Sequence, residues 1–141
     1  MNALYQIQDD ILKILKGKIP DFYLTGGTAL SRYYFHHRRS DDLDFFTRKF
    51  SIKRIHEVKT IIENSPGFSL NLTAEQTSDR FVKMMVYNVR RQSENVNLKI
   101  DFVEDYLDCR FPVKTVDGIN VHAIEDIYCN GRSSVFPSYD L

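Results

Sequence analysis

Residues 24–30 of this chain read Leu-Thr-Gly-Gly-Thr-Ala-Leu, and residues 40–46 read Ser-Asp-Asp-Leu-Asp-Phe-Phe. The first stretch predicts an apolar strand that stops at the glycine pair and is followed by a helix. The second predicts another strand, with Asp42 and Asp44 on one face, because side chains two apart in a strand point the same way. A strand, a glycine turn, a helix and a strand with two carboxylates form the unit around which we interpret the rest of the chain.

The composition favours one globular domain with an apolar core. The chain has 141 residues, of which 43% are apolar and 13% aromatic. Nineteen basic and nineteen acidic side chains give a formal net charge of zero, so the overall charge does not favour a polyanionic partner. Cys109 and Cys129 have no metal-ligand spacing and are most simply free thiols of a reducing compartment.

The N-terminus is not typical of a secretion signal. Asp9 and Asp10 interrupt its apolar residues, and no apolar run approaches the roughly 20 residues that span a bilayer. We therefore expect a soluble cytoplasmic protein that has no membrane segment.

The other expected elements follow from apolar periodicity. Helical spacing predicts helices over residues 2–17 and 28–35, and a third helix begins after Ser51 and runs to about residue 64. Strands are expected over residues 22–25, 42–47, 68–73, 81–89 and 96–103, with a hairpin around Asp117 and Gly118 and a further helix from residue 123 to about 129. This order predicts an α+β or α/β layered fold, and we favour an α+β fold with helices packed on a mixed sheet.

A third carboxylate follows in the last long strand. Leu98, Ile100 and Phe102 alternate toward the core, which places Asp101 on the opposite face. If this strand neighbours the strand of Asp42 and Asp44, three carboxylates converge and need a cation between them. Mg²⁺ prefers such oxygen ligands, and two ions could act in a phosphoryl displacement. Asp101 could also activate an acceptor hydroxyl as a general base.

Each of these signals has an ordinary interpretation when it stands alone. The two aspartates of residues 42–44 could be solvated carboxylates on an edge strand. Gly26 and Gly27 could form a simple strand-to-helix turn, with Thr28 as the N-cap. The combination of a glycine turn, two carboxylates after one helix and a third carboxylate later favours a site for metal and phosphate.

The quoted motifs resemble those of the AbiEii/AbiGii toxin family, which belongs to the nucleotidyltransferase superfamily with the DNA polymerase β-like fold. The match consists of the Gly-Gly-Thr-Ala-Leu turn and the Arg-x-Ser-x-Asp-h-Asp strand, where h is apolar, and it extends over about residues 5–128. This resemblance implies transfer of a nucleoside monophosphate from an NTP to an RNA (a tRNA) or a protein acceptor. It also implies the role of a toxin in a type IV toxin–antitoxin or abortive-infection system, with a cognate antitoxin as partner.

The resemblance also implies particular site residues. The carboxylates would bind Mg²⁺, one or two ions, and carry catalysis, and the turn and its neighbours would hold the triphosphate. The implied catalytic and metal residues are Asp42, Asp44 and Asp101, and the implied nucleotide-binding residues are Gly26, Gly27, Thr28, Arg38 and Ser40.

The C-terminal part departs from the family pattern. Residues 124–127 resemble the start of a helix that soon carries a functional lysine in the family, but Gly131 falls near the expected lysine here. We therefore interpret residues 1–141 as one nucleotidyltransferase-like domain that lacks the usual helical C-terminal region. Two alternatives to an active enzyme stay open: a truncated remnant that binds nucleotide or metal without turnover, and an interaction protein that binds neither.

Overall fold

The protein is a seven-stranded mixed sheet with helices on both faces, seen in a computed structural model that describes residues 3–35, 42–92, 94, 96–106, 112–124 and 127. The strand order is β3-β4-β5-β2-β1-β7-β6. The helical elements are α1 (Ala3–Leu15), α2 (Gly26–Ala29), the π-helical η1 (Leu30–Phe35) and α3 (Ile52–Glu63). The strands are β1 (Tyr23–Thr25), β2 (Asp42–Thr47), β3 (Phe68–Gln76), β4 (Met84–Arg91), β5 (Asn97–Glu104), β6 (Lys114–Val116) and β7 (Ile119–Val121).

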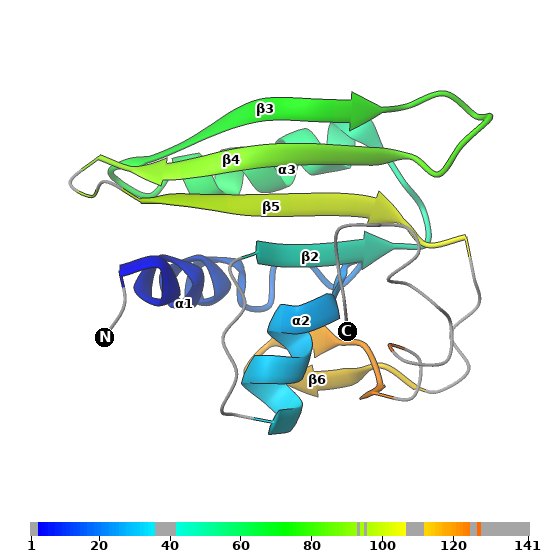
Figure 1. Cartoon of the computed structure of the whole chain (residues 1–141), viewed down its shortest axis with the longest axis horizontal. Helices are drawn as coiled ribbons and strands as arrows, with labels where there is room; N and C mark the ends of the chain where they lie inside the picture. Colours follow the sequence, from blue (N-terminus) through cyan, green and yellow to red (C-terminus); the bar gives the residue numbers. More distant parts are fainter. Residues whose placement is uncertain are drawn as a thin grey trace.

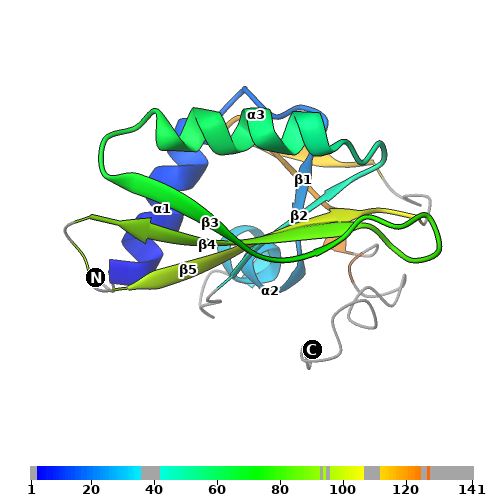
Figure 2. The same ribbon diagram turned by 90° about the horizontal axis from the view of Figure 1, so that it is seen from above.

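The two long helices cover one face of the sheet, and α2 lies on the other (Figures 1 and 2). Apolar side chains of α1 and α3 pack with the inward side chains of the strands into one continuous core. Phe102 lies at its centre, with its ring centroid 5.6 Å from that of Phe22, 5.9 Å from that of Phe45 and 6.0 Å from that of Tyr87. This α+β arrangement confirms the fold class that the sequence predicted.

Strand β2 occupies the middle of the sheet and fixes the orientation of the motif residues. It pairs antiparallel with β1 and parallel with β5. Leu43 and Phe45 are fully buried in the core, as their alternation predicted. The intervening aspartates therefore face the opposite side of the sheet, toward α2.

Several predicted boundaries were wrong. The strand expected over residues 68–73 continues to Gln76, because its polar end pairs with β4 across a bulge between Leu72 and Ala74. The strand expected from residue 81 begins at Met84, since Phe81 lies in the exposed connection and is 67% accessible. The helix expected from residue 28 begins at Gly26, and its second half, η1, has π-helical hydrogen bonding.

Two local signals were confirmed. The hydroxyl of Ser51 accepts a hydrogen bond from the Arg54 amide at 3.2 Å and so caps α3. Asp117 and Gly118 both have positive φ, at 50° and 75°, as the two-residue turn of a tight hairpin requires. Most of the helix expected over residues 123–129 lies outside the described residues. Within the described ranges, none of the helices is both long and apolar enough to cross a membrane.

Candidate active site

The three aspartates are brought together by the pairing of β2 with β5. Asp44 and Asp101 are direct cross-strand partners, and Asp42 pairs in the same way with Lys99. Asp44 is 2% exposed and Asp101 is fully buried, while Asp42 is partly accessible. The register therefore places the three carboxylates on one face of two neighbouring strands.

The glycine turn lies directly against one of these carboxylates. Gly26 has a φ of +72°, and a Cβ at this position would stand 2.5 Å from Oδ2 of Asp44. A side chain at residue 26 would therefore force the Asp44 carboxylate to move, which glycine avoids. A ligand that contacts the backbone of the turn is thus next to Asp44, which is what a metal–phosphate complex needs.

Thr28 has a different local role from the N-cap of our alternative interpretation, which was wrong. The residue in the N-cap position of α2 is Thr25, and its side chain makes no capping hydrogen bond. Thr28 is fully buried, and its hydroxyl donates a hydrogen bond to the carbonyl oxygen of Asp42. This bond ties α2 to the start of β2 and so fixes the glycine turn relative to the carboxylates. The predicted contact of Thr28 with triphosphate stays a prediction.

Lys99 is a member of the cluster that the motifs did not include. Its ammonium Nζ lies 3.1 Å from Oδ2 of Asp101 and 4.0 Å from Oδ2 of Asp42. Lys99 precedes Asp101 by two residues in the same strand, so the alternation that placed Asp101 on this face could also have placed Lys99 there.

Asp101 and Lys99 shift each other's pKa in the direction expected of an ion pair. Burial raises the pKa of the Asp101 carboxyl above its usual range, and the nearby Lys99 ammonium and a hydrogen bond between Asp101 and Asp44 oppose that rise. Partial burial by itself would lower the pKa of Lys99, but the charge and hydrogen bond of Asp101 outweigh it and raise that pKa. Positive charge is thus favoured at this position.

The side chains suit a hard divalent ion in kind, since all three are carboxylates and lie on one face of two paired strands. Among the residues that the structure describes, no three His, Cys, Asp or Glu side chains form a ready-made cluster of metal ligands. Two of the three aspartates interact instead with the Lys99 ammonium.

A buried histidine contacts the residue that precedes the glycine turn. His122 is fully buried, and its Nδ1 lies 3.1 Å from the hydroxyl of Thr25, the residue before the glycine pair. Its carbonyl oxygen accepts a hydrogen bond of 2.7 Å from the hydroxyl of Tyr34 in η1. His122, which directly follows β7, therefore contacts both the residue before α2 and a residue near the end of η1. Sequence reasoning missed His122, because its partners are about ninety residues away.

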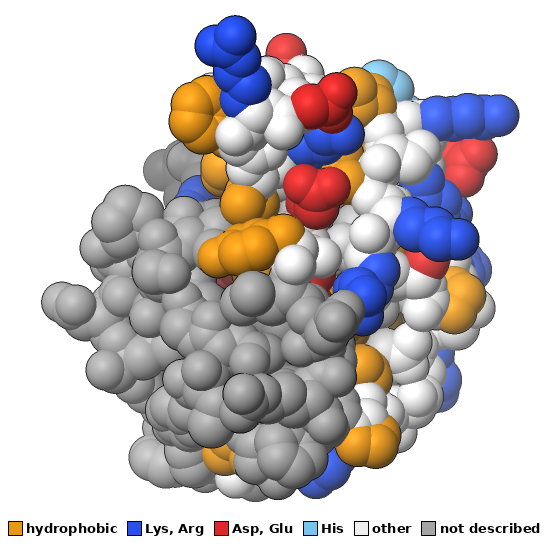
Figure 3. All heavy atoms as spheres, turned by 90° about the vertical axis from the view of Figure 1, so that its right-hand side faces the viewer, with side chains coloured by type: hydrophobic (Ala, Val, Ile, Leu, Met, Phe, Trp, Pro, Cys, Tyr) orange, Lys and Arg blue, Asp and Glu red, His pale blue; other side chains and the backbone are white. Residues whose placement is uncertain are grey.

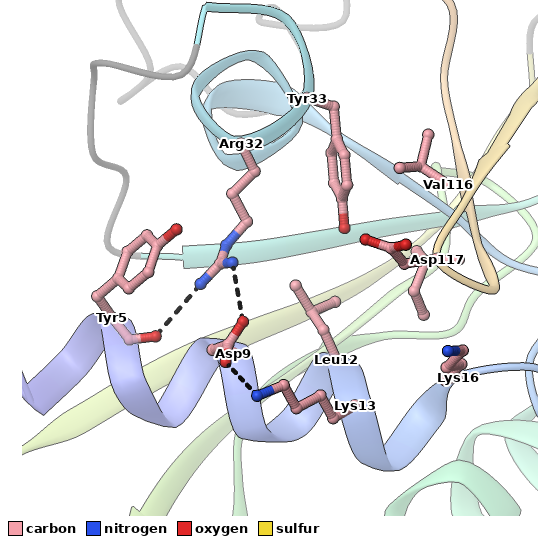
Figure 4. Close-up of a pocket in the computed structure, with 10 residues that line it drawn as sticks. Tyr5, Asp9, Leu12, Lys13, Lys16, Arg32, Tyr33, Val116 and Asp117 are labelled. Carbon is pink, nitrogen blue, oxygen red and sulfur yellow. Dashed lines mark hydrogen bonds and ion pairs between the residues drawn. The ribbon is translucent and has the colours of Figure 1, made fainter.

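Arg32 holds the same helical segment from its other side. Its guanidinium contacts Asp9 at 3.5 Å and the Tyr5 carbonyl oxygen at 3.2 Å, and it stacks 4.1 Å from the centroid of the Tyr5 ring. Figure 4 shows these contacts at the edge of a pocket of about 370 Å³ between α1, η1 and the β6–β7 hairpin. Asp9 already pairs with both Arg32 and Lys13, so we interpret the charged residues of this pocket as structural contacts that attach η1 to α1.

Two of the predicted nucleotide-binding residues, Arg38 and Ser40, lie outside the described residues. On the molecular face of Figure 3, basic and acidic side chains alternate over the part of the chain that the structure describes. No single-sign patch gathers on that part of this face, in agreement with the net charge of zero.

Comparison with known proteins identifies the family. The profile of the family described as "Nucleotidyl transferase AbiEii toxin, Type IV TA system" matches residues 11–129. The chain belongs to this family. No curated protein matches the chain.

Two solved structures are similar in fold to this AbiEii chain. One is a Helicobacter pylori protein described as a candidate nucleotidyltransferase, with a TM-score of 0.66, 25% sequence identity and coverage of 91% of this chain and 56% of the other. The second is JHP933 from Helicobacter pylori, with the same TM-score and identity and coverage of 91% and 54%. This AbiEii chain therefore spans just over half the length of both, and the match confirms a nucleotidyltransferase-like fold.

Proposed function

We propose that this AbiEii-family chain transfers a nucleoside monophosphate from an NTP to an acceptor hydroxyl on an RNA, such as a tRNA, or on a protein. The observation that carries the proposal is the approach of Gly26 to Asp44, with Asp101 as the cross-strand partner of that same aspartate. A backbone turn for phosphate and buried carboxylates for a metal then share one small space. The family description further supports the role of a toxin of a type IV system, with a cognate antitoxin as partner.

The three aspartates have distinct parts in this proposal. Asp42 and Asp44 would hold Mg²⁺ through carboxylate oxygens, and Asp101 completes the set from the neighbouring strand. When bound, the ion supplies positive charge to the triphosphate and to the leaving pyrophosphate. As the cross-strand partner of Asp44, Asp101 would also be placed to accept a proton from the attacking hydroxyl.

The turn and its supports orient the nucleotide. The backbone at Gly26 lies against the Asp44 carboxylate, and Gly27 follows it in the first turn of α2. Thr28, through its bond to the Asp42 carbonyl, and His122, through Thr25, keep that backbone in place before the substrate arrives. Such preorganisation lowers the cost of orienting the reacting groups.

The deciding experiment measures transfer from each of the four α-labelled NTPs, with Mg²⁺, to bulk tRNA and to the protein itself. Wild-type chain is expected to label one acceptor, and Asp44→Asn is expected to lose at least about a hundred-fold in rate, since it removes a metal ligand. The matched control is Asp79→Asn, which removes an exposed carboxylate far along the β3–β4 connection. Equal labelling by Asp44→Asn and wild type would contradict the proposal.

The same preparation distinguishes an enzyme from a binding remnant. Calorimetry with a non-hydrolysable NTP and Mg²⁺ reports binding independently of transfer. Binding that Asp44→Asn weakens, without labelling of any acceptor, would favour the remnant over the enzyme. If neither binding nor labelling is found, the result would favour an interaction protein over both the enzyme and the remnant.

A further inference from the structure

We propose that Lys99 is an internal counter-cation of the carboxylate cluster. Its ammonium occupies the position of the metal until metal and nucleotide bind together, and it then pairs with the triphosphate. The inference rests on the proposed function, and it concerns how the same site is regulated. It makes metal binding depend on the nucleotide, because an ion that comes alone must first displace a bound ammonium.

The register of the sheet places Lys99 where it can neutralise two carboxylates. It is the cross-strand partner of Asp42 and lies two residues before Asp101 on the same face. Its Nζ is 3.1 Å from Asp101 and 4.0 Å from Asp42. On its other flank, β4 presents the neutral Asn88, whose side-chain amide donates to Asn97 at 3.3 Å. The carboxylate side therefore supplies the charges that attract the ammonium in this part of the sheet.

Asp101 and Lys99 differ in their exposure to solvent. Asp101 is fully buried, so it needs a positive partner whenever it is ionised. The Lys99 side chain is 42% exposed and reaches the cluster from the solvent side. A lysine is a point charge on a flexible stem, so the same side chain can leave the carboxylates without a change in the backbone.

The ammonium and a divalent ion compete for the same oxygens. Asp101 uses Oδ2 toward Lys99, and so does Asp42. A metal bound there would stand within a few ångströms of the ammonium, and two cations at that distance repel each other. A triphosphate resolves this conflict because its negative charge offers Lys99 a new partner. Nucleotide then strengthens metal binding, and metal strengthens nucleotide binding to the same degree.

Removal of Lys99 is expected to affect metal binding differently from removal of an ordinary structural ion pair. If Lys99 merely stabilised the fold, its removal would weaken or leave unchanged every property of the site. If it competes with the metal, its removal must tighten metal binding in the absence of nucleotide and weaken the binding of nucleotide. The two roles therefore predict opposite signs for one measurement.

The test compares Mn²⁺ binding by calorimetry, without nucleotide, in the wild-type chain, Lys99→Met and Lys99→Arg. We expect Lys99→Met to bind Mn²⁺ about ten-fold more tightly than wild type, the order expected when a unit positive charge near a divalent ion is removed. Lys99→Arg keeps the charge and is expected to show no such gain. Lys83→Met is the matched control, because Lys83 pairs with the exposed Asp79 at 2.9 Å.

Melting curves with and without Mn²⁺ provide a second measurement and check that each variant folds. The Lys99→Met chain is expected to melt lower than wild type without metal and to gain more from added Mn²⁺. Unchanged or weaker Mn²⁺ binding by the folded Lys99→Met variant would overturn the inference and leave the proposed function standing. Mn²⁺ binding that Asp44→Asn does not reduce would instead contradict the proposed site itself.

Discussion

Gly26 and Asp44 are packed so closely that a Cβ on residue 26 would stand 2.5 Å from Oδ2 of the aspartate. Gly26 is the first residue of α2, directly after β1, and Asp44 lies in β2, which pairs with β1 so that Thr25 lies opposite Asp44. The contact is therefore a property of the sheet and does not depend on the local turn alone. It joins the element suited to phosphate and the residue suited to metal into one site.

Replacement of Gly26 by alanine is expected to abolish binding at the site. The new methyl group would force the Asp44 carboxylate away, and the φ of +72° would add strain of about 1–2 kcal/mol. Calorimetry with Mn²⁺ and a non-hydrolysable NTP measures the loss of binding, and a melting curve measures the strain.

Gly17→Ala separates these two effects. Gly17 has the same φ of +72°, but nothing lies within 4 Å of a Cβ built there. This variant is expected to lose a similar amount of stability from strain and to keep its ligand affinity. If both variants lost affinity equally, the contact with Asp44 would not be the cause.

The hydroxyl of Tyr34 is expected to contribute about 1 kcal/mol to the free energy of unfolding through its bond to the His122 carbonyl. Tyr34→Phe removes this bond and keeps the ring, which lies under the Lys114 ammonium at 5.2 Å. The midpoint of chemical denaturation measures the change. Tyr106→Phe, at an exposed tyrosine, is the control and is expected to leave the midpoint unchanged. Equal midpoints for Tyr34→Phe and wild type would show that the bond adds no net stability.

Acid is expected to weaken the attachment of α3. The guanidinium of Arg54 donates to both oxygens of Asp21 at 2.7 and 2.9 Å and to the Lys18 carbonyl oxygen at 2.9 Å. Partial burial would raise the pKa of Asp21, but the hydrogen bonds from Arg54, a backbone hydrogen bond at Asp21 and the charge of Arg54 outweigh it, and the pKa is lowered from its usual 3.8.

A lowered pKa fixes the sign of the pH effect. The stabilisation is fully present above pH 3.8, the pKa of Asp21 in the unfolded chain, and is lost as the pH falls through the lower folded value. Because the Asp21 side chain is 42% exposed, we expect about 1 kcal/mol or less. Melting curves of wild type and Asp21→Asn should therefore differ at pH 7 and converge toward pH 2. A difference that grows as the pH falls would contradict this assignment.

Much of this architecture could be predicted because its signals are local. The alternation of Leu43 and Phe45 with the aspartates fixed the face of β2, and the Asp117–Gly118 pair fixed the hairpin turn. These patterns reflect side-chain geometry within a few residues, which holds in any fold. The convergence of Asp44 with Asp101 needed one further assumption, that β2 and β5 are neighbours, and the sheet order confirms it.

The supporting residues could not be predicted, because their roles depend on contacts distant in the sequence. His122 reaches Thr25 across 97 positions, and Arg32 reaches the Gln8 side chain across 24. The π-helical form of η1 is likewise associated with anchors at Arg32 and Tyr34 and has no sequence signature of its own. Lys99 differs from these, since its alternation with Asp101 was visible, and it was missed because lysine is not a metal ligand.

The core packing beneath the site is expected to contribute to the free energy of unfolding without changing the affinity of the site for metal. Phe102 follows Asp101 in β5 and points to the opposite face, where its ring lies near those of Phe22, Phe45 and Tyr87. Phe102→Leu is therefore expected to lower the free energy of unfolding by about 1–3 kcal/mol through lost contacts and an imperfectly filled space. Phe81→Leu, at a position that is 67% exposed, should change it by less than about 0.5 kcal/mol. Because Asp101 keeps its place in the β5 register, Mn²⁺ affinity measured well below the melting temperature should stay within about two-fold of wild type in both variants. A large loss of affinity in folded Phe102→Leu would mean that the core and the carboxylate cluster are coupled, and that the backbone of β5 does not fix the site alone.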